Sequence, residues 1–275
     1  MSFFTLRRPG PALSPNGAAE PVSGGRISWE GIVAILAILA LWQFGSRVLP
    51  PFLFPPLQVI AATLARNLSD PATLGSIALT YGRIVLWLTV TFVLASALGI
   101  GAARSNALDR ALLPLIQLKQ GVPGVCWAIF AIIWFEDIEL RIAFVVVIST
   151  LPSFFFQARD GVRAISAELW DMVRALRPSR WQTLEKLVLP ALTPAFLTAW
   201  RINLGNGARI TITAELLAGI SGIGHQLRTA QEQFRMDEVM AWTVIIAAFV
   251  LLTDFGMSRL EKRLLGWRRQ GEDAR

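Results

Sequence analysis

The chain has 275 residues, of which 54% are apolar and only 16% charged. A soluble domain of this size carries about a quarter charged residues, so the composition excludes an ordinary soluble protein and indicates an integral membrane protein. The net charge of +7 does not indicate nucleic-acid binding, because the basic residues fall between apolar segments. The only cysteine, Cys126, and the only histidine, His225, are too few for a disulfide framework or a Cys/His metal site.

Six segments are long and apolar enough to cross a membrane. The first 30 residues are rich in Pro, Gly and Ser and lack the apolar core of a secretory signal, which predicts a flexible cytoplasmic tail (1–30). Crossing about 30 Å of hydrocarbon takes about 20 helical residues. A transmembrane domain (31–265) and a short cytoplasmic tail (266–275) follow. The predicted transmembrane helices cover residues 31–49, 77–102, 112–135, 140–156, 193–220 and 240–260.

Two proline-rich stretches interrupt this pattern. The four prolines of "LPPFLFPP" end the first predicted helix, and the next segment, "LQVIAATLARNLSD", is too short and polar to span, so we expect it at the outer interface. "KQGVPG" interrupts the third predicted span, with Lys119, Gly121 and Pro123 at the break. Such a break is tolerated where protein or a cavity satisfies the freed backbone groups, so these residues are candidates for a solute pathway.

The distribution of Lys and Arg predicts the orientation. Arginines crowd the segments on the side of the amino terminus, whereas the other side holds few arginines, and these lie beside acidic residues such as Glu136, Asp137 and Glu139. Because basic loops stay inside, we expect both termini and the segment 164–190 to be cytoplasmic.

The segment 164–190 is amphipathic and too polar for lipid. Leu169, Met172, Val173 and Leu176 form one apolar stripe on a short helix. Pro178 pushes the residue before it out of the α region, so this helix is expected to stop at Arg177.

A second helix is predicted directly afterwards. Ser179 followed by Gln182 is a capping-box pattern, Trp181 lies on the apolar side, and "LPALTP", which contains Pro190, is expected to end the helix. The helix pair fits a groove on a cytoplasmic partner, or equally the surface of the lipid headgroups.

Ionisable residues within predicted spans mark functional candidates. Arg83, Arg201 and Asp254 lie near span ends, where snorkelling explains them. Lys119, Arg209 and Glu215 are stronger candidates, with Asn206 beside Arg209 in "LGNG". They can line a pathway for an anion, or form structural ion pairs, with Glu215 expected to pair with a cation on another span or subunit.

The chain resembles the permease subunits of bacterial ATP-binding-cassette importers, in particular the nitrate, sulfonate and taurine branch. The resemblance rests on "LPPFLFPPLQVI", "LDRALLPLIQLKQGVPGVCWAIFAIIWF", "SRWQTLEKLVLPALTPAFLTAWRINLG" and "TAELLAGISGIGHQL". The family's loop signature is Glu-Ala-Ala, then Gly four residues on, then Leu-Pro thirteen after that. Asp171, Met172 and Val173 stand at its first positions, Arg177 at the glycine, and Pro190 at the proline. The family glycine permits a left-handed turn, and Arg177 before a proline is expected to turn by another route.

The resemblance implies an all-α, six-span, type I importer permease in the bacterial inner membrane. It implies cytoplasmic ATPase subunits, a periplasmic solute-binding protein and a second permease subunit in a homodimer or heterodimer. No G-x-x-x-x-G-K-[S/T] loop occurs in the chain, so ATP and Mg are expected in the ATPase, and the chain itself performs no covalent chemistry. The alternatives are a self-contained secondary transporter, which would need coupling-ion sites and usually an internal repeat, and a membrane enzyme or scaffold. The resemblance also assigns ATPase coupling to a set of loop residues: Asp171, Met172, Val173, Leu176, Arg177, Ser179, Trp181 and Pro190.

Overall fold

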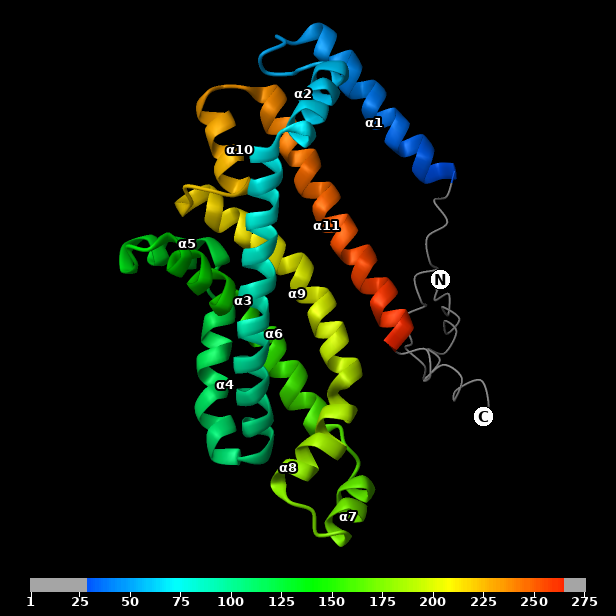
Figure 1. Cartoon of the computed structure of the whole chain (residues 1–275), viewed down its shortest axis with the longest axis vertical. Coiled ribbons are helices and arrows are strands. Elements are labelled where there is room, and N and C mark those ends of the chain that lie inside the picture. The colour runs from blue at the N-terminus through cyan, green and yellow to red at the C-terminus, as the bar shows by residue number, and fades with distance from the viewer. Residues whose placement is uncertain (1–28, 265–275) are drawn as a thin grey trace, which may run out of the picture.

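The computed structural model describes residues 29–264, so the predicted tails lie outside the described residues except for Trp29 and Glu30. The described part of the chain consists of helices joined by short connections (Figure 1). Its elements, in chain order, are α1(Trp29–Val48), α2(Leu57–Ser69), α3(Pro71–Arg104), α4(Asn106–Gln120), α5(Gly124–Trp134), α6(Ile138–Arg163), α7(Ala167–Ala175), α8(Arg180–Thr183), the π-helical turn η1(Leu184–Val188), α9(Leu189–Ala218), α10(Ile223–Glu232) and α11(Met236–Leu264).

Five helical stretches between residues 29 and 264 are long and apolar enough to cross a membrane. They are Trp29–Val48, Pro71–Arg104, Ile138–Arg163, Arg180–Ala218 and Met236–Leu260. A sixth crossing is added if α4 and α5 form one broken span. The predicted all-helical membrane fold is therefore confirmed.

The longest helix of the central bundle, α3, has a well-defined start. Asp70 accepts hydrogen bonds from the backbone amides of Ala72 (3.3 Å) and Thr73 (3.1 Å) and from the Thr73 hydroxyl (3.0 Å). Pro71 follows at the first helical position, where no backbone N–H is needed. The bonds from Thr73, and then that from Ala72, hold the pKa of Asp70 below its ordinary value. This cap fixes the entry of the chain into the bundle.

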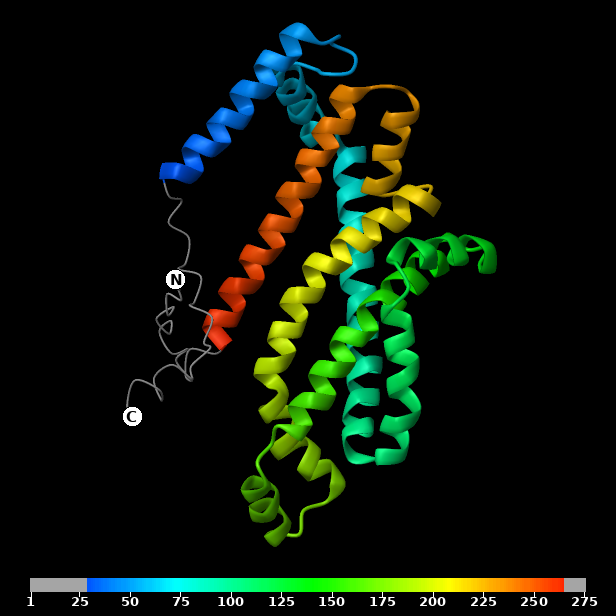
Figure 2. The ribbon, with the colours of Figure 1, turned by 180° about the vertical axis from the view of Figure 1, so that it is seen from behind.

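The core lies where α3, α6 and α9 pack side by side (Figures 1 and 2). Phe154 and Phe155 of α6 are fully buried there, as are Leu88 of α3 and Ala199 of α9. Small residues allow the backbones to approach closely, which is the usual basis of helix packing in lipid. A Cβ atom on Gly99 would lie only 2.5 Å from the Phe155 carbonyl oxygen.

The other helices attach at the margins of this core. In α1 only Ser46 is buried, which suits a helix that faces lipid, and Trp42 fixes its end by stacking on Phe54 at 4.0 Å. The amphipathic α2 is joined to the start of α11 by polar contacts. The Thr63 hydroxyl donates to Asp237 (2.9 Å), and the Asn67 amide donates to Glu238 (2.8 Å).

The third predicted span, 112–135, is interrupted at the predicted break, because α4 ends at Gln120, α5 begins at Gly124, and the two helices meet at 100°. Pro123 has no backbone N–H with which to continue α4, and α5 starts anew after it. Rings from α5 and α6 then hold α5 to the side of the bundle (Figure 1), with Trp134 and Phe144 5.7 Å apart.

The boundaries of the later spans also differ from expectation. The fourth predicted span, 140–156, corresponds to the longer helix α6, Ile138–Arg163. The sixth predicted span, 240–260, corresponds to α11, Met236–Leu264. The expectation that "LPALTP" ends the second loop helix is wrong, because helical structure runs unbroken from Arg180 to Ala218. The wider turn η1 ends at Val188, two residues before Pro190, so the helix accommodates the missing proline N–H locally instead of ending.

Two glycines of α3 provide a matched test of the close approach to α6. We expect Gly99→Ala to destabilise the folded chain by about 1–3 kcal/mol, because the new methyl overpacks against α6 backbone. Gly82→Ala, in the same helix but with open space around the position, should be neutral or stabilising by about 0.5 kcal/mol. Thermal unfolding in detergent micelles would measure both, and equal effects would contradict the packing argument.

Candidate functional site

The segment between α6 and α9 forms a helix pair that protrudes from one end of the bundle (Figure 1). The Ser166 hydroxyl caps α7 by accepting from the Leu169 amide at 3.4 Å. Ser179 caps α8 with the predicted capping box, in which its backbone N–H donates to Gln182 Oε1 (2.8 Å) and its Oγ accepts from the Gln182 N–H (3.2 Å). Both short helices therefore have well-defined starts.

The apolar side chains of this helix pair face outward. No residue of α7 is buried, and Leu176 and Trp181 are 79% and 69% exposed. Met172 is exposed as well, whereas Val173 is half-buried. Exposed large apolar side chains in a charged segment are the expected property of a docking surface.

Arg177 forms the turn between the two helices in the left-handed region, with φ of +46°. Its N–H donates to the Arg174 carbonyl at 3.0 Å. The expectation that Arg177 turns by another route than the family glycine is therefore wrong. The arginine adopts a left-handed conformation, which costs a residue with a Cβ atom about 1–2 kcal/mol. The end of α7 and the capped start of α8 hold the chain in this turn.

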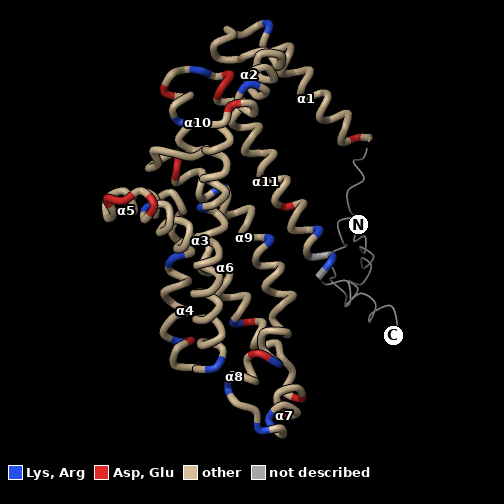
Figure 3. Tube along the Cα trace, in the orientation of Figure 1, with Lys and Arg blue, Asp and Glu red and all other residues tan. Residues whose placement is uncertain are grey.

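Basic residues predominate at this end of the molecule (Figure 3). Asp171 and Arg174 form an exposed ion pair at 3.2 Å. Farther into the bundle, Asp109 of α4 binds Arg159 (2.5 Å) and Arg163 (2.8 Å) of α6. The helix pair thus carries an apolar surface with a basic rim.

A buried ionic cluster lies nearer the other end of α3 and α9. The Arg83 guanidinium of α3 is bound to Glu215 of α9 at 2.7 Å, and Glu215 has no exposed surface. Arg83 also pairs with Glu139 of α6. Its remaining donors reach the Ser221 carbonyl (3.1 Å) and hydroxyl (2.9 Å). One cation therefore joins three helices and the turn after α9.

The Glu215 carboxylate is fully committed within the bundle. It accepts hydrogen bonds from the Thr80 hydroxyl (2.9 Å) and from the Gly224 backbone amide (3.1 Å) in addition to Arg83. Gly222 passes directly over it with φ of +97°, and a Cβ atom there would fall 2.3 Å from the Glu215 Oε1 atom. The glycine is needed both for its backbone conformation and for its lack of a side chain.

The interpretation of Arg83 as a snorkelling residue is wrong, because its side chain is only 4% exposed. The expectation that Glu215 pairs with a cation on another span is confirmed by the contact with Arg83. Sequence reasoning missed Arg83, Glu139 and Thr80 as members of this cluster. The sequence signal for their pairing was that Arg83 and Glu215 have opposite charges and both lie within predicted spans.

A polar contact with α6 holds the break between α4 and α5. Lys119, half-buried at the end of α4, donates from Nζ to the Ser149 carbonyl oxygen at 3.2 Å. Gly121 and Pro123 are exposed at the bend. These three residues lie together at the bend between α4 and α5.

Asn206 and Arg209 form a second group on an exposed face of α9. Arg209 Nη1 lies 3.4 Å from Asn206 Oδ1, and both residues are exposed. Glu215 belongs to neither group, because its carboxylate is held by Arg83 and Thr80.

Arg201 and Asp254 pair at 3.2 Å between α9 and α11.

The described residues contain no group of three or more His, Cys, Asp or Glu side chains that could hold a metal ion. What they present is a helical membrane bundle, a buried ion cluster, a half-buried cation on α4, an exposed cation on α9, and a protruding helix pair. These features define a helical membrane protein with an exposed apolar surface at one end of its bundle.

Comparison with known proteins specifies the class. Residues 95–266 match the family described as "binding-protein-dependent transport system inner membrane component". The chain is 26% identical over 250 residues to the putative aliphatic sulfonates transport permease protein SsuC of Bacillus subtilis (strain 168), covering 90% of this chain and 91% of that protein. It is 28% identical over 243 residues to the taurine transport system permease protein TauC of Escherichia coli (strain K12), covering 86% and 88% respectively.

A solved structure shares the fold. A chain of the MetNI methionine ABC transporter in an inward-facing conformation aligns with a TM-score of 0.57 and 14% identity, over 70% of this chain and 98% of that one. Because the family match covers more than half of the chain, the protein belongs to the inner membrane components of binding-protein-dependent transport systems. It is a permease component of an ABC transporter and is not itself catalytic.

Two glutamates that share Arg83 test the buried cluster. Glu215→Gln should lower the free energy of unfolding by about 3 kcal/mol, because it leaves a buried guanidinium partly uncompensated. Glu139→Gln should cost less than about 1 kcal/mol, because the Glu139 side chain is 51% exposed. Unfolding in detergent would compare the two variants, and an equal or reversed order would show that burial does not determine the strength of this cluster.

Proposed function

We propose that this chain is the permease subunit of an ATP-driven importer in which the helix pair α7–α8 couples the membrane domain to separate ATPase subunits. The observation that carries the proposal is the outward-facing apolar surface of the pair, with Leu176 79% exposed and no residue of α7 buried. Burying one such leucine stabilises a complex by about 1.5–3 kcal/mol. ATP and Mg would be bound by the ATPase subunits.

The orientation that we propose places α7, α8 and both termini in the cytoplasm. Support comes from the charges, because basic side chains predominate at the end that carries α7 and α8 (Figure 3) and basic segments stay inside. The opposite end would then receive the solute from a periplasmic binding protein.

The solute that we propose is a small anion, passed by alternating access between this chain and a second permease subunit. Two related proteins are described as transporting aliphatic sulfonates and taurine. In this chain, Lys119 lies at the broken span and Arg209 on an exposed face of α9. We assign these cations, with Asn206, Gly121 and Pro123, to the solute pathway. Glu215 instead stabilises the bundle, because Arg83, Thr80 and Gly224 occupy its carboxylate.

The docking role predicts a specific loss of association. Leu176→Asp places a charge on the proposed contact surface, so affinity for the ATPase should fall at least about tenfold. Ala107→Asp is the matched control, because it adds the same charge to an exposed first turn of α4 at the same end of the bundle and should leave association unchanged. Co-purification and ATP hydrolysis in lipid would measure both, and unchanged association of Leu176→Asp would refute the docking role.

The pathway role of Arg209 predicts a change in apparent solute affinity. Arg209→Gln should raise the KM for the anionic solute about tenfold, because it removes a charge-assisted hydrogen bond, and Arg209→Lys should recover part of that loss. The assay is ATP hydrolysis by the assembled transporter stimulated by binding protein loaded with taurine, an alkanesulfonate or nitrate. A KM unaffected by both variants, for a solute that stimulates the wild type, would remove Arg209 from the pathway.

A further inference from the structure

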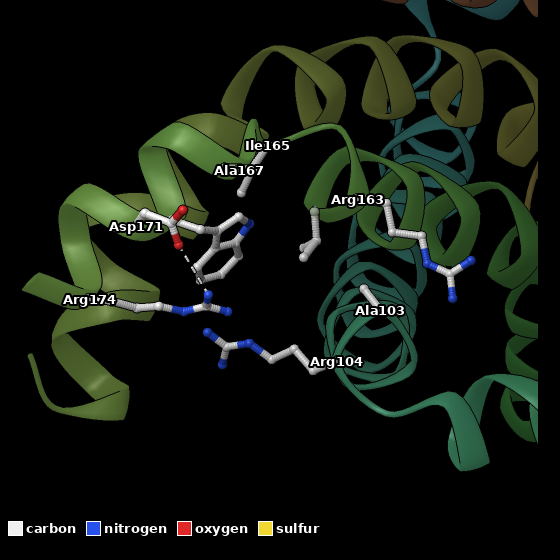
Figure 4. A pocket seen from close by; sticks show the side chains of 9 residues that line it. Ala103, Arg104, Arg163, Ile165, Ala167, Asp171 and Arg174 are labelled. Atoms are coloured by element: carbon white, nitrogen blue, oxygen red, sulfur yellow. Dashed lines mark hydrogen bonds and ion pairs between the residues drawn. The ribbon is translucent and has the colours of Figure 1, made fainter.

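A cavity of about 640 Å³ lies between the protruding helix α7 and the ends of α3 and α6 (Figure 4). Its walls include Ala103 and Arg104 from α3, Arg163 from α6, and Trp170, Asp171 and Arg174 from α7. Three of these six side chains carry guanidinium groups and one carries a carboxylate; the guanidinium groups of Arg104 and Arg174 face the cavity, whereas that of Arg163 points away from it (Figure 4). The cavity is therefore a basic recess, distinct from the outward apolar surface of Leu176 and Trp181.

The three arginines differ in how their charges are compensated. Arg163 is bound by Asp109 at 2.8 Å, and Arg174 is bound by Asp171 at 3.2 Å. Arg104 has neither a hydrogen bond nor an ion pair with any residue between 29 and 264. Its guanidinium carbon lies 5.9 Å from the centre of the Trp170 ring, which directs the group into the cavity.

The guanidinium groups of Arg104 and Arg174 point toward one another across the cavity (Figure 4). Like charges that face each other repel, and the repulsion grows as the surroundings become less polar. An anion between them would convert this repulsion into two charge-assisted interactions. The planar fork of arginine matches the oxygen geometry of phosphate, and both arginines have free donors.

The geometry points to a phosphate-binding site in which Arg104 and Arg174 donate to the oxygens of one phosphate group beside the Trp170 ring. The phosphate is either the headgroup of an anionic phospholipid or a free phosphate ion. The level of the cavity, at the end of two membrane-spanning helices and next to a tryptophan, suits a headgroup.

Occupation of this site would attach α7 to the bundle. The protruding helix buries none of its residues, and within the cavity only Trp170 joins α7 to the apolar cluster around Val162. A phosphate bridging Arg104 and Arg174 adds a polar connection between α3 and α7. The binding site does not depend on the proposed contact with an ATPase, so the two can be tested separately.

The experiment uses the full chain without any ATPase. Hydrogen exchange of residues 167–175 is measured in nanodiscs of phosphatidylcholine alone, in the same nanodiscs with inorganic phosphate, and in nanodiscs that contain phosphatidylglycerol. If only phosphatidylglycerol slows the exchange, a lipid headgroup is the source of the phosphate. If inorganic phosphate and phosphatidylglycerol each slow it, the cavity is a general phosphate site. Both results support the proposal.

Three variants test which residues hold the ligand. Arg104→Gln should reduce about tenfold the affinity for phosphate or phosphatidylglycerol, measured as slower hydrogen exchange of residues 167–175. Arg110→Gln removes an equal charge from an exposed position on α4 outside the cavity and should change it by less than about twofold. Asp171→Asn removes the cavity's carboxylate and should strengthen binding.

Three outcomes would overturn the assignment. The first is exchange unchanged by phosphate and by phosphatidylglycerol. The second is an equal loss in Arg104→Gln and Arg110→Gln, which would indicate general attraction of charge to the membrane surface. The third, measured in a separate sample to which ATPase is added, is protection of residues 167–175 that appears only in that sample, which would make the cavity a protein contact.

Discussion

The fold depends on the buried ion pair between Arg83 and Glu215. Burying two charges costs several kcal/mol unless their geometry and additional hydrogen bonds compensate, and here Thr80, Glu139, Ser221 and Gly224 provide these partners. The cluster fixes α3, α6, α9 and the turn into α10 relative to one another. Because hydrocarbon offers no alternative hydrogen-bond partners, the positions of these elements are mutually constrained.

The apolar segments could be predicted from the sequence because long helices are the natural way to satisfy backbone groups in lipid. What could not be predicted depends on contacts between distant residues. Arg83 and Glu215 are separated by 132 positions, so their pairing left no local pattern. The bend after Lys119 takes its direction from ring contacts such as Trp134 with Phe144. Local rules likewise marked Pro190 as a helix end, although a π-helical turn accommodates it.

In the candidate site, features that depend on neighbouring residues could be predicted from the sequence, and features that depend on the surrounding backbone could not. Ser179 and its capping box depend on residues three positions apart, so the sequence was sufficient. Arg177 was expected to avoid the left-handed region, yet it adopts φ of +46°. The backbone geometry needed to reverse the chain outweighs the preference of one residue. Contacts with other subunits depend on residues outside this chain, so no short sequence pattern within the chain could predict them.

The continuity of α8, η1 and α9 has a mechanical consequence. Residues 180–218 form one helical rod, about 58 Å long at the usual rise per residue. One end of this rod carries Trp181 at the protruding surface, and the other carries Glu215 in the ionic cluster. The regular hydrogen bonding of this rod is altered at η1 and at Pro194 inside α9, and these are the points at which a helix bends most easily. A displacement imposed at Trp181 would therefore divide between bending there and a tilt of α9 about its far end, which Arg83 holds through Glu215.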